Sequence, residues 1–292
     1  SGYQWYLEEF PVPDASSDSR GRMHHPNYRS MAEQTLDQLN ALPAAEREAL
    51  LDGLRAALVP VPVWLDGLDR AGFGLLCLGE EHDDHTRRFL AEQVLPALPL
   101  DTLHLETTPA GLADIERRLR LGRDYTPLLG ADIGGVLRAA RLATPKLTVT
   151  AIEETEQQGK DRLRAGTGSR EDSLVGNLAA VYVPGRRNAV LMGALHCTDD
   201  AGWLYERTRR RLPPDDAERA VSMRILGEHQ DGPLEAFIYF LDETGIAPAD
   251  FALTDPHSLP PLVQVWFRLL WHETIGRFDT VLVFRAGPPR GG

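Results

Sequence analysis

The feature that most restricts the fold of this chain is an apolar run that ends abruptly in charge. "FGLLCLG" (residues 73–79) is apolar throughout, and "EEHDDH" (residues 80–85) follows it with four carboxylates and two imidazoles. A continuous apolar run of this length is typical of a strand buried on both faces of a parallel sheet. The charged side chains would then begin where the strand leaves the core.

Three further strand-like runs have the same form. They are "TLHLE" (residues 102–106), "LTVTAIEE" (residues 147–154) and "NAVLMGALH" (residues 188–196). The segments between the strands carry apolar residues at helical spacing, as residues 86–98 and 174–182 show. Alternating strands and helices predict an α/β fold, with a mostly parallel β-sheet sandwiched between two layers of helices.

The two ends of the chain follow other patterns. Residues 1–70 form an irregular and helical flank, in which Ser30 can cap one helix and residues 44–58 fit a second. Residues 71–292 would form the α/β domain. Within that domain we also expect strands at 220–226, 234–241 and 279–287, a helix at 262–271, and a polar loop at 157–169.

Charge and cysteine content limit the partners and the compartment. The formal net charge is −12 with no block of basic residues, which argues against nucleic acid or an anionic membrane as the main partner. No apolar run approaches 18 residues, and the first residues lack a signal-peptide pattern. Cys77 and Cys197 are too few for a disulfide framework and suit a reducing compartment, so we expect a cytoplasmic protein.

Acidic and imidazole side chains stand at the ends of the predicted strands. The first strand leads into Glu80 and His82, the second into Glu106, and the fourth into His196. The carboxyl ends of parallel strands meet at one edge of the sheet, where ligands of such folds bind. Glu106 alternates with leucines, so its burial without a partner would be costly. We therefore expect these four residues to share one site.

Further polar residues could contribute to that site. Arg170 opens a helix that a Ser169–Asp172 capping box predicts, and its guanidinium could clamp an anion or keep a carboxylate ionised. The candidates for contact with a substrate are Glu81, His85, Glu153 and Asn177.

Other nearby residues have simpler explanations. His104 is expected to pack in the core, and Asp83 and Asp84 to begin the next helix. Cys197 has no base beside it except its neighbour His196, so a nucleophilic thiol is not expected. The chain lacks the glycine patterns of a serine nucleophile elbow, a dinucleotide fold or a phosphate loop.

This set of residue types supports two kinds of chemistry. A histidine beside carboxylates can take a proton from water, and an arginine can stabilise the oxyanion that develops on a carbonyl group. Two imidazoles with a carboxylate (His82, His196 and Glu106) are also ligand types of zinc, manganese or cobalt sites. We favour the route without a metal, and a divalent metal remains the alternative.

The order of these motifs resembles that of the erythromycin esterase, ChaN-like and Tiki superfamily. "LLCLGEEHDDH", "LHLE", "SREDSLVGNL" and "AVLMGALH" are similar, in that order, to the family's two strand ends, its Arg-to-Asn helix and its His-terminated strand. The matching positions are Glu80, His82, Glu106, Arg170, Asn177 and His196. The resemblance extends over residues 73–196, which is under half of the chain.

The resemblance implies several functions. Erythromycin esterase-like members hydrolyse macrolactone esters without a metal and use a histidine base, Tiki-like members are metal-dependent proteases, and ChaN-like members are linked to haem uptake. The two Gly-x-x-His motifs of this chain resemble the Tiki pattern, whereas its Arg-to-Asn helix resembles the esterase pattern.

We therefore expect a hydrolase of ester or amide bonds that acts on a natural product or a peptide. His82 would be the general base with Glu80 orienting it, and His196 a second acid/base or a ligand. A lyase or cyclase of natural-product biosynthesis could use the same residues. A haem- or ligand-binding protein without turnover is the third possibility, with His24, His25 and Tyr28 as candidate axial ligands.

Overall fold

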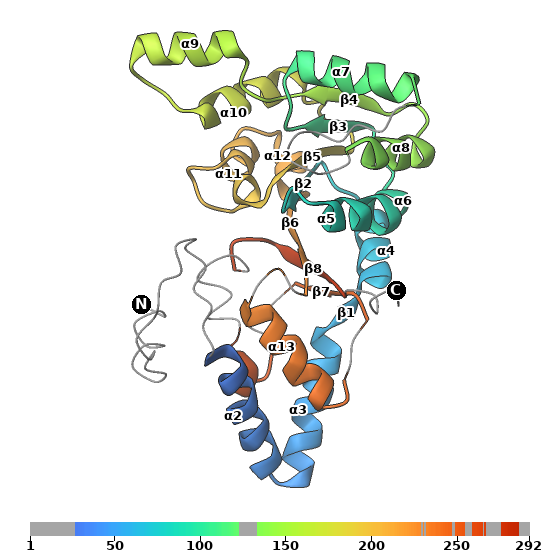
Figure 1. The fold of residues 1–292 in the computed structure, drawn as a ribbon, viewed down its shortest axis with the longest axis vertical. Coiled ribbons are helices and arrows are strands. Elements are labelled where there is room, and N and C mark those ends of the chain that lie inside the picture. Colours follow the sequence, from blue (N-terminus) through green and yellow to red (C-terminus); the bar gives the residue numbers. More distant parts are fainter. Residues whose placement is uncertain are drawn as a thin grey trace. The chain divides into compact units, whose positions relative to one another are not determined.

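The computed structural model describes residues 27–122, 133–228, 230, 232–246, 249–254, 259–264, 266 and 276–285 (Figure 1). The chain divides into two compact units. We call residues 62–225 the parallel unit, and the described parts of residues 1–61 and 226–292 the terminal unit. The predicted boundary after residue 70 stays a prediction.

The fold is α/β, and its strands form one eight-stranded, mostly parallel sheet in the order β1-β7-β8-β6-β2-β5-β3-β4. This confirms the predicted fold class. The five neighbouring strands that pair in parallel are β6 (Ala220–Gly227), β2 (Leu75–Glu80), β5 (Asn188–Gly193), β3 (Thr102–Leu105) and β4 (Thr148–Ala151). All six residues of β2 are buried, as a strand covered on both faces requires.

Helices cover both faces of the sheet in the parallel unit. In Figure 1, α5, α6 and α8 lie on one side of β2, β5 and β3, and α10, α11 and α12 lie on the other. The helices of this unit are α4 (Val61–Ala71, from the last residue of the other unit), α5 (Asp84–Phe89), α6 (Leu95–Ala97), α7 (Pro109–Arg120), α8 (Ile133–Ala143), α9 (Glu156–Ala165), α10 (Arg170–Val181), α11 (Leu204–Arg209) and α12 (Pro214–Glu218). A π-helical turn, η1 (Leu90–Val94), joins α5 to α6, and a 3₁₀ turn, η2 (Ala194–Cys197), follows β5.

The terminal unit combines helices with the antiparallel strands. Its elements are α2 (Asn27–Ala41), α3 (Ala44–Ala57), β1 (Val59–Pro60), α13 (Gly232–Glu243), β7 (Phe251–Leu253) and β8 (Thr280–Phe284). β7 pairs antiparallel with both β1 and β8. Helix α13 packs against α2, and the Arg29 guanidinium lies 3.2 Å from the centre of the Tyr239 ring.

Several predicted elements are wrong. Residues 234–241 form part of helix α13 rather than a strand, because a short and mostly apolar segment also suits a buried helix. The expected loop at 157–169 contains helix α9, which begins at a Thr155–Gln158 capping box. Helix α2 starts before Ser30, so that serine lies inside the helix. By contrast, residues 262–264 and 266 of the helix predicted at 262–271 are helical, and the rest of that segment lies outside the described residues.

The cysteines also differ from expectation. Cys77 of β2 and Cys197 of η2 form a disulfide, with their Cα atoms 5.5 Å apart. β5 ends at Gly193, so His196 and Cys197 lie in η2 and not on the strand. The 3₁₀ turn brings Cys197 against the neighbouring strand, a contact that a straight continuation of β5 would not make.

Candidate functional site

The carboxyl end of β2 places a buried carboxylate beside an arginine and a histidine. Glu80 is 2% exposed, and its two oxygens accept hydrogen bonds of 2.8 Å from Nη2 and Nε of Arg87 on α5. A bidentate pair of this kind combines charge with fixed geometry. Burial alone would raise the pKa of Glu80, but hydrogen bonds from Arg87 and His82 outweigh it, so this pKa lies below its ordinary value.

His82 turns back over Glu80. Its φ of 54° is the one left-handed value among the non-glycine residues that the structure describes. That conformation is costly for a side chain with a Cβ, and such strain is concentrated at functional sites. Nδ1 of His82 lies 3.1 Å from Oε1 of Glu80. The hydrogen bond to Glu80 raises the pKa of His82 above its ordinary value, although partial burial opposes the shift.

Glu106 lies between two imidazoles. Its Oε2 is 3.4 Å from Nε2 of His82 and accepts a 2.8 Å hydrogen bond from the backbone N–H of Gly193. Its Oε1 is 3.6 Å from Nε2 of His196 and accepts a 2.7 Å hydrogen bond from Nη2 of Arg170. The carboxylate therefore links the ends of β2, β3 and β5, as the strand topology predicted.

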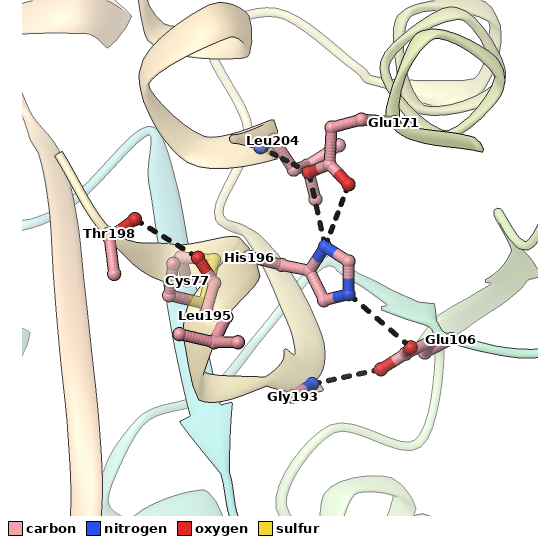
Figure 2. Close-up of a disulfide and its surroundings, with 9 residues drawn as sticks. Cys77, Glu106, Glu171, Gly193, Leu195, His196, Thr198 and Leu204 are labelled. Carbon is pink, nitrogen blue, oxygen red and sulfur yellow. Dashed lines mark hydrogen bonds and ion pairs between the residues drawn. A yellow bond between two sulfur atoms is a disulfide. The ribbon is translucent and has the colours of Figure 1, made fainter. Parts of the chain in front are cut away.

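His196 is held from its other side by Glu171 (Figure 2). Nδ1 of His196 lies 2.9 and 3.1 Å from the two oxygens of Glu171, and the backbone N–H of Leu204 donates to the same carboxylate. The edge of the imidazole also meets Trp203, with ring centres 5.4 Å apart. His196 and Glu171 are both buried, at 8% and 7% exposed.

Arg170 joins the ends of β3 and β4. It donates to Glu153 through Nε and Nη2 and to Glu106 through Nη2, while Nη1 lies 3.4 Å from Nε2 of His196. The hydrogen bond to Glu153 is the main cause that raises the pKa of Arg170, so the group stays charged. Of the two roles considered for Arg170, these contacts favour holding carboxylates ionised.

These eight side chains form what we call the carboxyl-end cluster: Glu80, His82, Arg87, Glu106, Glu153, Arg170, Glu171 and His196. It contains the five residues predicted to be catalytic and Glu153 from the predicted binding set. Four carboxylates face two guanidinium groups, so the formal charge is −2 until the imidazoles accept protons. A cluster with this excess of negative charge disfavours the binding of an anion.

The other predicted binding residues have their own partners or positions. Glu81 pairs with Arg224 of β6 at 3.0 Å, and His85 is exposed on α5. The side-chain amide of Asn177 donates to the carbonyls of Ile152 and Glu153, which ties α10 to the end of β4. A contact of these residues with a substrate stays a prediction.

The expectations for the neighbouring helix and for the core histidine are confirmed. Asp83 is the N-cap of α5 and accepts a 2.7 Å hydrogen bond from the backbone N–H of Thr86, and Asp84 lies in the first turn. His104 is fully buried on β3, where its ring nitrogens lie 2.7 Å from Oγ1 of Thr150 and 3.2 Å from Oδ1 of Asn188.

Two members of the cluster were missed by sequence reasoning. Arg87 lies one helical turn inside α5, beyond the charged residues 80–85 from which the candidates were chosen. Glu171 follows Arg170 directly, and its signal was the acidic residue inside the Ser169–Asp172 capping box, which a helix dipole explains equally well.

The described residues contain neither a group with metal-binding geometry nor a membrane-spanning helix. Among residues 27–122, 133–228 and the shorter described segments, no group of three or more histidines, cysteines and acidic residues has the geometry to hold a metal ion. The metal-dependent alternative on His82, Glu106 and His196 stays a prediction. In the same described segments, no helix combines the length and the apolar character needed to cross a bilayer.

Comparison with known proteins does not assign a family. No protein-family model and no curated protein matches the chain. A solved structure described as "Bacterial protein toxins" aligns with 77% of this chain at 13% identity and a TM-score of 0.37. The alignment covers 53% of that chain, so this chain spans about half of its length. A likeness at this level carries no inference about fold or function, and the functional hypothesis depends on the geometry of the cluster.

Proposed function

We propose that this protein is an acid/base hydrolase that cleaves an ester or amide bond at the carboxyl-end cluster. The observation that carries the proposal is the Glu80–His82 pair, in which Glu80 contacts Nδ1 of the imidazole while Nε2 faces Glu106. A carboxylate that fixes one imidazole nitrogen and leaves the other directed into a polar site is the usual arrangement of a general base. The resemblance to erythromycin esterase-like proteins favours the same chemistry.

His82 is suited to activate water. Its side chain is 49% exposed, so solvent reaches it, while Glu80 holds the proton on Nδ1. Nε2 then takes a proton from water as the oxygen attacks the carbonyl carbon, and the departing alcohol or amine takes a proton from a second acid. Because Glu80 raises the pKa of His82, a protonated fraction persists near neutral pH and activity should rise as that proton is lost.

The electrostatics of the cluster indicate the kind of substrate. Arg170 already binds Glu106 and Glu153, which leaves Nη1 as the nitrogen best placed for an oxyanion. The excess of carboxylates would repel an anionic group. We therefore expect the acyl group that reacts here to be uncharged or cationic, as in a lactone, a simple ester or a peptide bond.

The test is hydrolysis in H₂¹⁸O with three probes: 4-nitrophenyl butyrate, a macrolactone and a peptide amide. We expect one or more to be cleaved with ¹⁸O in the acid product, and His82→Ala to lower kcat/KM about 10²- to 10⁴-fold. Cleavage without ¹⁸O would show elimination or cyclisation and contradict the proposal, as would full activity in His82→Ala. A chelator should leave the rate of hydrolysis unchanged. Loss of activity in the presence of a chelator would favour the metal-dependent alternative.

The ligand-binding alternative can be tested on the same protein. Of its candidate axial ligands, His24 and His25 lie outside the described residues, whereas Tyr28 lies in α2 beside Gly232. Titration with haemin should give no sharp Soret band in a hydrolase, and a saturating band would contradict our proposal.

A further inference from the structure

We infer that Glu171 is a positioning residue that holds His196 in one tautomer and so makes it the second acid/base group of the site. The inference rests on the proposed hydrolase function and names the residue that supplies the second proton. Glu171 acts through His196 and is not itself expected to touch a substrate.

The position of Glu171 is fixed from two directions. Helix α10 begins at Arg170, and the Ser169–Asp172 capping box sets the first turn that carries Glu171. The backbone N–H of Leu204, at the start of α11, donates to Oε1 of Glu171. The same carboxylate faces Nδ1 of His196 with both of its oxygens, Oε2 at 2.9 Å and Oε1 at 3.1 Å.

This arrangement selects a single tautomer of the imidazole. A buried carboxylate that faces Nδ1 of His196 needs a proton there, because burial of an unpaired charge is costly. Turning the ring over would present a carbon to Glu171 and leave the charge unpaired. The proton therefore stays on Nδ1, and Nε2 faces the interior of the cluster.

Nε2 of His196 has a partner for each of its protonation states. When it is unprotonated it can accept from Nη1 of Arg170, which lies 3.4 Å away. When it is protonated, its positive charge lies within ion-pair distance of Oε1 of Glu106, 3.6 Å away. A group that is accommodated in both states can give up a proton and recover it, which a general acid must do in every cycle.

The Glu171–His196 pair is arranged like the Glu80–His82 pair. Both imidazoles face a carboxylate with Nδ1 and direct Nε2 toward Glu106, His82 toward its Oε2 and His196 toward its Oε1. In the hydrolysis of an ester, His82 would take one proton from water while the C–O bond to the attacking oxygen forms. His196 would give one proton to the leaving oxygen as the second C–O bond breaks. Exchange of one proton with solvent restores both imidazoles, and the products are the acid and the alcohol.

The test is Glu171→Gln, read by ¹⁵N NMR of His196 and by kinetics. The carbonyl of the glutamine must serve Leu204, so its NH₂ group meets Nδ1 and donates to it. We expect the proton to move to Nε2, kcat to fall about 10²-fold or more, and KM to change less than threefold. Glu171→Asp keeps an acceptor and should restore the Nδ1 tautomer and part of kcat.

Glu206→Gln is the matched control. Glu206 is a buried carboxylate of α11 that pairs with Arg209 and Arg210 and not with an imidazole. It should leave the tautomer and kcat unchanged. An unaltered His196 tautomer in Glu171→Gln, or an equal loss of kcat in Glu206→Gln, would overturn the inference. The NMR measurement needs no substrate, so inactivity of the wild-type protein would contradict the proposed hydrolysis without deciding the role of Glu171.

Discussion

His104 and His82 show how one sheet gives the same side chain two opposite properties. His104 lies within β3 between the neutral partners Thr150 and Asn188, and burial lowers its pKa to about 4. His82 lies beyond the end of β2 against Glu80, which raises its pKa. The interior of β3 thus keeps His104 uncharged, whereas the position beyond the end of β2 favours protonation of His82. The charge of the partner decides the direction of the shift.

The substitution expected to have the largest effect on the difference between the two histidines is Glu80→Gln. Loss of the carboxylate should lower the pKa of His82 and reduce kcat/KM about 10²- to 10⁴-fold, because the imidazole loses the group that orients it. An NMR titration of His82 and ester hydrolysis measure the two effects. Glu228→Gln, which alters another buried carboxylate paired with an arginine, should change neither. An unchanged His82 pKa in Glu80→Gln would refute the explanation.

The second test alters the other histidine. His104→Leu fills a similar volume but leaves the hydrogen-bonding groups of Thr150 and Asn188 without the imidazole. We expect a loss of roughly 2–6 kcal/mol of unfolding free energy, at about 1–3 kcal/mol for each group. Urea denaturation measures it. The pKa of His82 should stay the same, and a shift there would show that the two regions are coupled.

The pH dependence of the unfolding free energy also tests the difference between the two histidines. The folded pKa of His104 lies below its unfolded value of 6.5, so the unfolded chain binds more protons between the two values. Its contribution is present above pH 6.5 and is lost as the pH falls towards about 4, by about 3 kcal/mol in total. The raised pKa of His82 acts in the opposite sense, with stabilisation below pH 6.5 that is lost as the pH rises. As the pH rises across this range, the urea midpoint of the wild type should increase relative to that of His104→Leu. A constant difference between the two midpoints would disprove the assignment.

The smallest expected effect is that of Gly193→Ala. A Cβ at this position would lie 2.7 Å from Nε2 of His82, so the imidazole has to shift. We expect about a 10-fold loss of kcat/KM from the displaced base, with unfolding free energy changed by less than about 1 kcal/mol. Gly176→Ala, where a Cβ meets nothing within 4 Å, is the control. Equal rates in the two variants would show that the close approach has no role.

The same contrast explains which features the sequence could predict. Long apolar runs identified β2 and β5, and the rule that parallel strands end at one edge is enough to group Glu80, His82, Glu106 and His196 from the sequence alone. Helix α13 was mistaken for a strand because periodicity does not distinguish a buried helix from a buried strand over so short and mostly apolar a segment.

Contacts between residues that are far apart in the sequence could not be predicted from it. Glu171 and His196 are 25 residues apart, and their pairing depends on the angle at which α10 meets η2. The contact between Cys77 and Cys197 depends on the turn that follows β5, which no local pattern specified. Side-chain types can be assigned to an edge of a sheet from sequence, but the pairing of those side chains is set by tertiary packing.

The disulfide has a consequence for cleavage of the chain. It joins residues 120 apart and encloses the segment that carries Glu106, Arg170 and Glu171. A protease that cuts once within this loop, for example at the exposed turn around Gly166, produces two fragments. The first contains Cys77 and the second contains Cys197. The two fragments stay covalently joined until a reductant is added, so a nicked molecule would keep both of its imidazole pairs and migrate as a single species on a non-reducing gel.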